Sequence, residues 1–271
     1  MDLGLSGRKA IVCASSQGLG KACALALAEA GVSVVINGRN RELLEATARE
    51  IRGLAKVDVT VVHADVSTQH GQSALLEACP EPDILVNNNG GPPFRNFREL
   101  GRQELLQGVT MNMVTPIELI QRVIEGMAAR QFGRIVNITS QSVKMPISGL
   151  DLSSGARAGL TAFLAGVARD VAHRNVTINN LLPGSFDTAR LSSGLAAAAN
   201  RRGVPESTVV EEWRRGIPAR RFGRASEFGQ TCAFLCASMR IPLTEIKKTR
   251  SGNAALWIIG IPSWCVDIPA T

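Results

Sequence analysis

The sequence lacks tyrosine altogether, and aromatic residues of any kind make up only 4% of its 271 residues. A reaction that needs a phenol as its acid or base is therefore excluded. Long apolar runs are also missing, since none approaches the roughly 20 residues that a membrane-spanning helix requires. The first residues do not combine a basic start with an apolar core, so no signal peptide is expected. We therefore predict a cytoplasmic protein without a membrane partner.

The six cysteines form no C-x-x-C motif and no paired spacing typical of a metal site, so no metal is expected. Cys13, Cys23, Cys232 and Cys236 lie within apolar runs, where free thiols are usually buried. This use of cysteine is typical of a reducing compartment.

Basic residues exceed acidic ones, with 30 Lys and Arg against 23 Asp and Glu, for a net charge of +7. Seven arginines concentrate in one stretch, namely Arg201, Arg202, Arg214, Arg215, Arg220, Arg221 and Arg224. This basic stretch is either a solvated face or a surface that attracts an anionic substrate or carrier. No nucleic-acid-binding motif accompanies the charge, so nucleic acid is not an expected partner.

Short β-rich runs alternate with longer helical ones along the chain. Strands are predicted at 9–14, 33–37, 56–63, 83–87, 134–139 and 177–182, and helical segments at 18–30, 40–52, 100–130 and 153–174. This rhythm predicts a Rossmann-type α/β fold, a doubly wound parallel sheet of about seven strands between two layers of helices. No linker interrupts it, so residues 1–271 are expected to form a single domain. The Gly-, Ala- and Arg-rich residues 188–224 predict a lobe over the sheet's carboxyl edge, where ligands of such sheets bind.

A glycine-containing turn joins the first strand to the first helix. Small residues there let backbone N–H groups approach a pyrophosphate at the helix N-terminus. The predicted dinucleotide contacts are Ala14, Ser15, Ser16, Gln17, Gly18, Leu19 and Gly20. A tight turn without a ligand is the alternative.

The second strand ends in Asn37, Gly38 and Arg39, which are expected to meet the adenosine ribose. An acid at this place would bind the 2′-hydroxyl of NAD, whereas an arginine favours the 2′-phosphate of NADP. The sequence therefore favours NADP(H) over NAD(H), with an arginine that merely covers a surface turn as the alternative.

These motifs, in this order, resemble the classical short-chain dehydrogenase/reductase family, in particular its β-ketoacyl-acyl-carrier-protein reductase-like members. The resemblance spans about residues 5 to 239. It implies further cofactor contacts in three segments, at the family's acid after the third strand, its N-N-A-G motif and its P-G-x-x-x-T motif. These contacts are Asp65, Val66, Asn88, Asn89, Gly90, Pro183, Gly184, Ser185, Phe186 and Thr188.

The family's catalytic set is Asn, Ser, Tyr and Lys, and the resemblance places it at Asn112, Ser140, Ser153 and Arg157. Ser153 thus occupies the tyrosine position, and Arg157 occupies the lysine position, which also binds the cofactor. The i, i+4 spacing keeps both side chains on one helical face. A serine hydroxyl is a much weaker acid than a phenol, and an arginine stays protonated, so the usual proton relay cannot run unchanged.

The sequence offers other candidates for the proton donor. Asp151 and Lys144 lie near the expected site, and a water molecule could fill the space of the missing phenol. An acid at a helix N-terminus also complements the helix dipole, and a loop lysine is usually solvated. His63, His70 and His173 fall outside the expected site and are assigned surface or packing roles.

The resemblance implies an NADP(H)-dependent oxidoreductase that reduces a carbonyl, such as a 3-oxoacyl thioester, and that forms a homo-oligomer, either a dimer or a tetramer. One alternative is a dinucleotide-binding protein without dehydrogenase activity, acting as a sensor or assembly subunit. Another is a non-redox reaction in the same pocket. The basic stretch suggests recruitment of an anionic thioester. Residues 240–271 depart from the family's pattern, so the last strand is left open.

Overall fold

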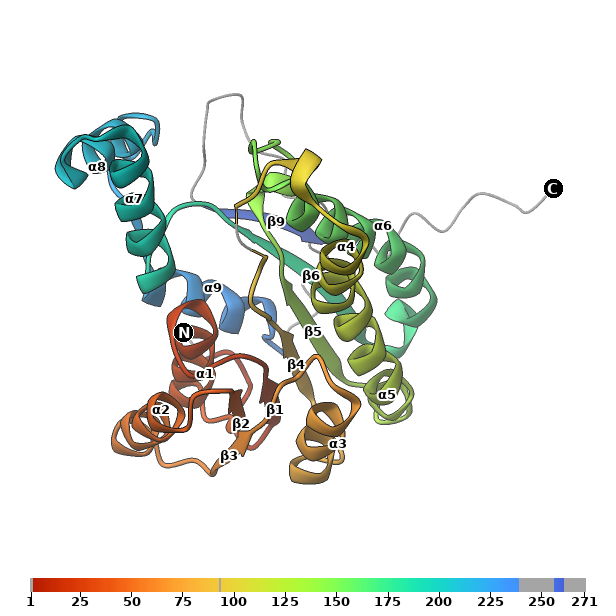
Figure 1. Ribbon diagram of the computed structural model, residues 1–271. Coiled ribbons are helices and arrows are strands. Elements are labelled where there is room, and N and C mark those ends of the chain that lie inside the picture. The colour runs from red at the N-terminus through yellow and green to blue at the C-terminus, as the bar shows by residue number, and fades with distance from the viewer. Residues whose placement is uncertain (1, 93, 239–255, 261–271) are drawn as a thin grey trace.

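The computed structural model describes residues 2–92, 94–238 and 256–260 (Figure 1). Seven strands form one sheet in the order β3-β2-β1-β4-β5-β6-β9. Their bounds are β1 Lys9–Val12, β2 Ser33–Gly38, β3 Val59–His63, β4 Ile84–Asn87, β5 Gly133–Ile138, β6 Val176–Pro183 and β9 Leu256–Gly260. The first six are mutually parallel, which confirms the predicted α/β fold and all six predicted strands to within a few residues.

Helices cover both faces of the sheet. Their bounds are α1 Gly18–Glu29, α2 Arg41–Leu54, α3 Gln69–Ala78, α4 Arg102–Val109, α5 Thr115–Ala129, α6 Asp151–Val171, α7 Ala189–Arg202, α8 Glu206–Arg215 and α9 Ala225–Leu235. One core lies under α1, α2 and α9, and the other lies under α3, α5 and α6. Strand β1 serves both, because Ala10 and Val12 face the first core and Ile11 faces the second.

Local sequence signals explain several of these boundaries. Asn40 caps α2 by accepting a hydrogen bond from the Leu43 N–H at 3.0 Å, as its position predicts. Thr68 caps α3 in the same way, a helix that the pattern analysis did not identify. Cys13, Cys23, Cys232 and Cys236 are buried free thiols, as expected.

The seventh strand corrects one part of the prediction. Strand β9 pairs antiparallel with β6, from Asn179 opposite Gly260 to Pro183 opposite Leu256, so the sheet is mixed rather than wholly parallel. An antiparallel edge strand is common on such sheets, because its ladder hydrogen bonds are satisfied without a helical crossover. The rest of the atypical segment 240–271 lies outside the described residues.

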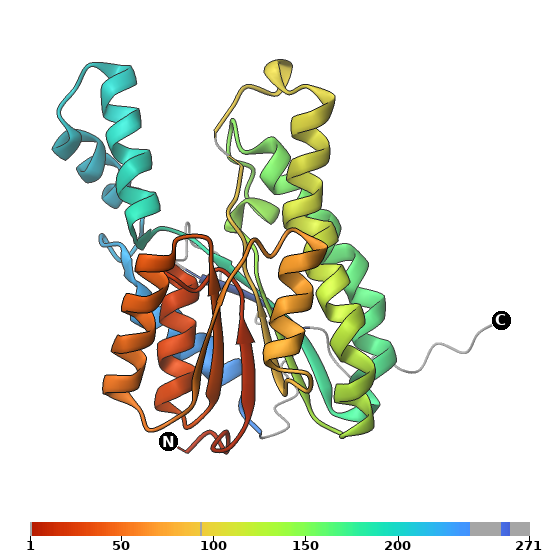
Figure 2. The same ribbon diagram turned by 60° about the horizontal axis from the view of Figure 1, so that its bottom comes forward.

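Helices α7 and α8 form a lobe that stands apart from the layered body in both views (Figures 1 and 2). Helices α7 and α8 pack on each other through a small core of Leu195, Ala199 and Val209. Two short strands, β7 (Phe186–Asp187) and β8 (Gly223–Arg224), pair in parallel and close the base of the lobe. In the ranges that the structure describes, no helix is both long enough and apolar enough to cross a membrane.

Candidate active site

The loop after β1 has the shape of a phosphate cradle. A Cβ added to Gly20 would lie 2.4 Å from the Ala14 carbonyl oxygen and 2.7 Å from Asn88 Nδ2, so no side chain fits there. Gly18 adopts a φ of 60°, a conformation that favours glycine. The N-cap residue of α1, Gln17, makes no capping hydrogen bond with its side chain, and the first turn holds no acid. The first N–H groups of α1 are thus left for an anion such as a pyrophosphate.

Ser15 and Asn37 support this loop from beneath. The Ser15 hydroxyl donates to the Val12 carbonyl at 2.7 Å and accepts from the Asn37 backbone N–H at 3.0 Å. The Asn37 amide donates to the carbonyls of Val62 and Ala64 and so ties β2 to the end of β3. Both side chains are buried and engaged, which fixes the loop rather than exposing these groups to a ligand.

The predicted ribose end lies where β2 and β3 finish. Arg39 Nη1 is 3.7 Å from Asp65 Oδ2, and both side chains remain partly exposed. Partial burial raises the pKa of Asp65, but hydrogen bonds from Ser67 and the charge of Arg39 outweigh it and lower this pKa overall. His63 Nε2 lies 2.8 Å from the Arg39 carbonyl oxygen, and this contact links the ends of β2 and β3.

The P-G-x-x-x-T segment faces the glycine loop from the opposite side. A Cβ on Gly18 would lie 4.0 Å from Thr188 Cγ2, which brings together two motifs about 170 residues apart. The Thr188 hydroxyl caps α7 by accepting from the Leu191 N–H at 3.4 Å. Ser185 Oγ accepts a hydrogen bond from Trp213 Nε1 at 2.8 Å, which links the segment to α8.

A row of three asparagines forms the floor of the site. Asn87, Asn137 and Asn180 stand directly opposite one another at the carboxyl ends of β4, β5 and β6. Asn87 Nδ2 donates to Asn137 Oδ1 at 2.9 Å, and Asn137 Nδ2 donates to Asn180 Oδ1 at 3.1 Å. The sequence analysis missed this row, because only the register of the strands reveals it.

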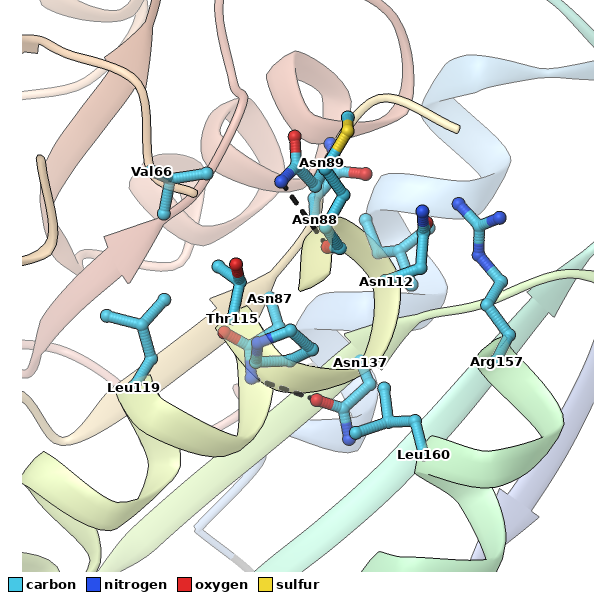
Figure 3. A pocket seen from close by; sticks show the side chains of 13 residues that line it. Val66, Asn87, Asn88, Asn89, Asn112, Thr115, Leu119, Asn137, Arg157 and Leu160 are labelled. Carbon is cyan, nitrogen blue, oxygen red and sulfur yellow. Dashed lines mark hydrogen bonds between the residues drawn. The ribbon is translucent and has the colours of Figure 1, made fainter. Parts of the chain in front are cut away.

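A cavity opens above this floor (Figure 3). Its wall includes Asn112 and Arg157 of the predicted catalytic set, together with the predicted cofactor residues Val66, Asn88 and Asn89. Among the described residues, Asn87 Oδ1 and Thr115 Oγ1 are buried without a hydrogen-bond partner. Since both residues line the cavity, its wall offers polar atoms to a water molecule or ligand.

Asn112 lies in a π-helical segment, Thr110–Val114, between α4 and α5. Its side chain is 5% exposed and donates to the Gly108 carbonyl at 3.2 Å. Such π segments interrupt regular helices and occur frequently at functional sites. This segment turns Asn112 toward the cavity that Arg157 also lines.

Ser153 and Arg157 meet as their i, i+4 spacing on α6 predicts. Arg157 Nη1 donates to Ser153 Oγ, and the Ser153 side chain is itself buried. Burial, followed by the charge of Arg190, lowers the pKa of Arg157 to about 10, so the guanidinium stays charged at neutral pH. The serine therefore holds the guanidinium, and the guanidinium rather than the serine lines the cavity.

The other candidate donors are placed differently. Ser140 follows β5, and its hydroxyl accepts hydrogen bonds from the Ser142 backbone N–H and hydroxyl at 3.1 and 2.9 Å. The turn Gln141–Val143 that follows Ser140 packs against α6, but Ser140 itself is not among the residues that line the cavity. Lys144 and Asp151 are exposed, and Asp151 lies in the first turn of α6, where its charge complements the helix dipole.

The basic stretch is largely committed to contacts within the lobe and its base. Arg202 forms a bidentate pair with Glu212, and Arg221 forms another with Glu227. Arg215 pairs with Glu211, and Arg214 stacks on Phe222. Exposed pairs of this kind contribute little stability individually, but they neutralise much of the charge that the sequence displays.

The chain is similar to known proteins in both sequence and structure. A family model described as short chain dehydrogenase matches residues 8–197. The NADPH-dependent reductase BacG of Bacillus subtilis is 31% identical over 257 residues, which cover 92% of this chain and 98% of BacG. The 3-oxoacyl-[acyl-carrier-protein] reductase FabG of Aquifex aeolicus is 27% identical over 248 residues, which cover 90% of this chain and 96% of FabG. The crystal structure of YwfH, an NADPH dependent reductase involved in bacilysin biosynthesis, superimposes with a TM-score of 0.80 at 30% identity, over 86% of this chain and 92% of YwfH.

Proposed function

This chain belongs to the short-chain dehydrogenase family, and on that premise we propose that it is an NADPH-dependent oxidoreductase that reduces a carbonyl group, with Arg157 as its charged hydrogen-bond donor. The observation that carries the proposal is the position of this guanidinium. Arg157 lines the cavity together with Asn112 while Ser153 holds it from behind. The phenol of the family's usual set is replaced by a cation that serine orients.

The glycine loop supports dinucleotide binding. Gly20 packs closely against the Ala14 carbonyl, which keeps the turn tight, and the first turn of α1 carries neither an acid nor a capping side chain. A pyrophosphate would find backbone N–H groups and the positive end of the helix dipole there. Thr188 lies beside Gly18, so both residues would meet the same part of the cofactor.

Arg39 supports a preference for NADP(H). No acid stands at the end of β2, where NAD-binding proteins hold the ribose 2′-hydroxyl. The pair between Arg39 and Asp65 is long and partly exposed, so it contributes little and can yield to a 2′-phosphate. BacG and YwfH, both described as NADPH-dependent, agree with this preference.

Bound NADPH would supply the hydride, and the protein would orient the carbonyl and stabilise the negative charge that gathers on its oxygen. A guanidinium has five N–H donors, and Ser153 accepts from Arg157. The remaining donors can bind the carbonyl oxygen. A charge-assisted hydrogen bond is worth about 1.5–3 kcal/mol, or roughly 10- to 100-fold in rate when it forms in the transition state.

In this proposal, the proton that completes the reduction comes from a water molecule held in the cavity, and the hydroxide left behind takes a proton from bulk solvent. Asn112, Asn87 and Thr115 present polar atoms to it, and such groups hold buried water through two to four hydrogen bonds. Ser140 would donate to the same carbonyl oxygen, as its counterpart does in the family. This arrangement replaces general acid catalysis by a phenol with electrostatic stabilisation by Arg157, which predicts a slow enzyme on unactivated ketones.

We further propose that the protein is a homo-oligomer built on α4 and α6. Leu105 and Leu106 on α4 and Phe163 on α6 are between 42% and 56% exposed. A Cβ on Gly155 or Gly166 of α6 would meet nothing within 4 Å, so this face allows a second copy to approach closely. Light scattering should give the mass of a dimer or tetramer for the unaltered protein and a lower mass for Phe163→Glu. A variant with the same mass as the unaltered protein would contradict this proposal.

The experiment that tests the function is a titration followed by turnover. NADPH and NADH binding is measured by cofactor fluorescence, and absorbance loss is then followed with 3-oxoacyl thioesters, diketones and quinones. We expect NADPH to bind more tightly and at least one carbonyl to be reduced. Arg157→Ala should lower kcat at saturating NADPH by about 10- to 100-fold, and Arg157→Lys should recover part of the loss. Tight NADPH binding with no carbonyl reduced would favour a dinucleotide sensor instead.

A further inference from the structure

Two guanidinium groups from distant parts of the chain converge on Gly91. A Cβ built on this glycine would lie 2.8 Å from Nη2 of Arg190 and 3.4 Å from Nη1 of Arg157. Arg157 projects from the second turn of the body helix α6, whereas Arg190 lies in the first turn of the lobe helix α7. The two cations therefore face each other across the junction between body and lobe.

No acid in the described part of the chain neutralises this pair. Neither Arg157 nor Arg190 forms an ion pair within 4.0 Å, whereas Arg202 and Arg221 of the lobe each hold a carboxylate in bidentate geometry. Like charges this close disfavour one another, and the effect of Arg190 on the pKa of Arg157 is the sign of that repulsion. An anion between the two groups would remove this cost.

The donors of both groups are only partly used. Arg190 reaches the carbonyls of Gly91 and Pro92 at 3.5 Å each, which is the outer limit of a hydrogen bond. Arg157 lines the cavity, and within the described part of the chain its guanidinium donates only to Ser153. Planar, forked donors of this kind fit the two oxygens of a carboxylate.

We propose that Arg157 and Arg190 together bind a carboxylate of the substrate, so that the preferred substrate is an oxo acid rather than a neutral ketone or ester. This inference rests on the proposed function and names the substrate class of the same site. Arg190 is a specificity-determining residue in this account. Because α7 carries it, the bound carboxylate also links the lobe to α6.

A phosphate of the cofactor has the same chemistry as a carboxylate and is the competing source of the anion. The two sources differ in what Arg190→Ala should weaken. A substrate carboxylate predicts that the affinity for oxo acids falls by about 10- to 100-fold while the dissociation constant of NADPH changes by less than about threefold. A cofactor phosphate predicts that NADPH binding weakens by the larger factor, and this result would overturn the proposal.

The test uses complexes that need no turnover. The NADP⁺-loaded protein is mixed with pyruvate, acetoacetate or levulinate, each beside its methyl ester, and binding is read from the shift in Tm. We expect at least one acid to raise Tm and its ester not to. Arg190→Ala should abolish the shift and Arg190→Lys should retain part of it. Arg49→Ala, which removes an exposed arginine on α2, serves as the control and should leave the shift intact.

A second arm measures reduction of the same acids and esters with NADPH. Binding of an acid that depends on Arg190, with no reduction of any compound, would refute the proposed reductase function and leave the carboxylate site standing. Reduction of acids and esters with equal kcat/KM, together with equal Tm shifts, would refute the carboxylate site and leave the reductase function standing. The two failures are therefore distinguishable.

Discussion

Restoring the phenol tests whether the cavity still accommodates the family's usual chemistry. Ser153→Tyr alone places an aromatic ring at a side chain that is 3% exposed and in contact with Arg157. Overpacking of a buried site costs about 1–3 kcal/mol, so this single variant should lose several degrees in Tm. Arg157→Lys alone removes the hydrogen bond to Ser153, at a cost of about 1 kcal/mol.

In the double variant Ser153→Tyr/Arg157→Lys, the loss of stability should be smaller than the sum of the losses in the two single variants. A lysine at position 157 is narrower than the guanidinium and leaves space for the tyrosine ring at position 153. We therefore expect the loss in the free energy of unfolding to be about 0.5–3 kcal/mol smaller than the sum of the two single losses. Activity should follow the same pattern. A phenol that acts as general acid is worth roughly 10²- to 10⁴-fold, and only the double variant provides both the phenol and the room for it.

The assay is a double-mutant cycle in which Tm and kcat are measured for all four proteins at saturating NADPH. The pH profile gives an independent readout, because the double variant contains a phenol that titrates and the parent chain contains none. Additive losses in Tm, and a kcat in the double variant no higher than that of Arg157→Lys, would refute the reasoning that Ser153 and Arg157 stand where the tyrosine and lysine once functioned together.

Three further predictions follow from particular contacts. Arg39→Ala should weaken NADPH binding by about 10-fold or more and NADH binding by less than threefold. Arg41→Ala, which removes an exposed arginine, is the control, and equal weakening of both cofactors would count against the 2′-phosphate site. Ala14→Gly should raise the free energy of unfolding by about 0.5–1 kcal/mol in a denaturant titration. Ala14 has a φ of 44°, and the strain energy relieved by glycine exceeds the entropic cost of a more flexible unfolded chain. A lower free energy of unfolding would contradict this. Hydrogen bonds from Arg221 lower the pKa of Glu227 from 4.5 to about 2. The stability that this pair adds to the folded protein is therefore present above about pH 4.5 and is lost as the pH falls toward 2. Glu227→Gln should flatten the change in Tm over this range, and an unaltered slope would refute the prediction.

The sequence was sufficient for those features that depend on neighbouring residues. The strands and the glycine loop follow from local patterning and turn chemistry, and Ser153 meets Arg157 because both lie on one helix. The pair of arginines at Gly91 could not be predicted, since Arg157 and Arg190 become neighbours only when the lobe folds back toward α6.

The remaining differences have a similar origin. The asparagine row depends on the register of β4, β5 and β6, which no single segment encodes. The direction of β9 is fixed by its pairing with β6, and the apolar sequence of β9 suits a parallel or an antiparallel neighbour equally. The charge of the basic stretch could be counted from the sequence, but its pairing with Glu212 and Glu227 required the fold.

The most direct test of the account is deuterium transfer from NADPH in which both hydrogens at the nicotinamide C4 position are replaced by deuterium. The protein is incubated with labelled NADPH and a panel of oxo acids and ketones, and the alcohols are analysed by mass spectrometry. The account predicts one deuterated alcohol for each NADPH consumed, formed at least about 10-fold more slowly by Arg157→Ala. Tight binding of NADPH by the unaltered protein with no deuterated alcohol from any compound would contradict it.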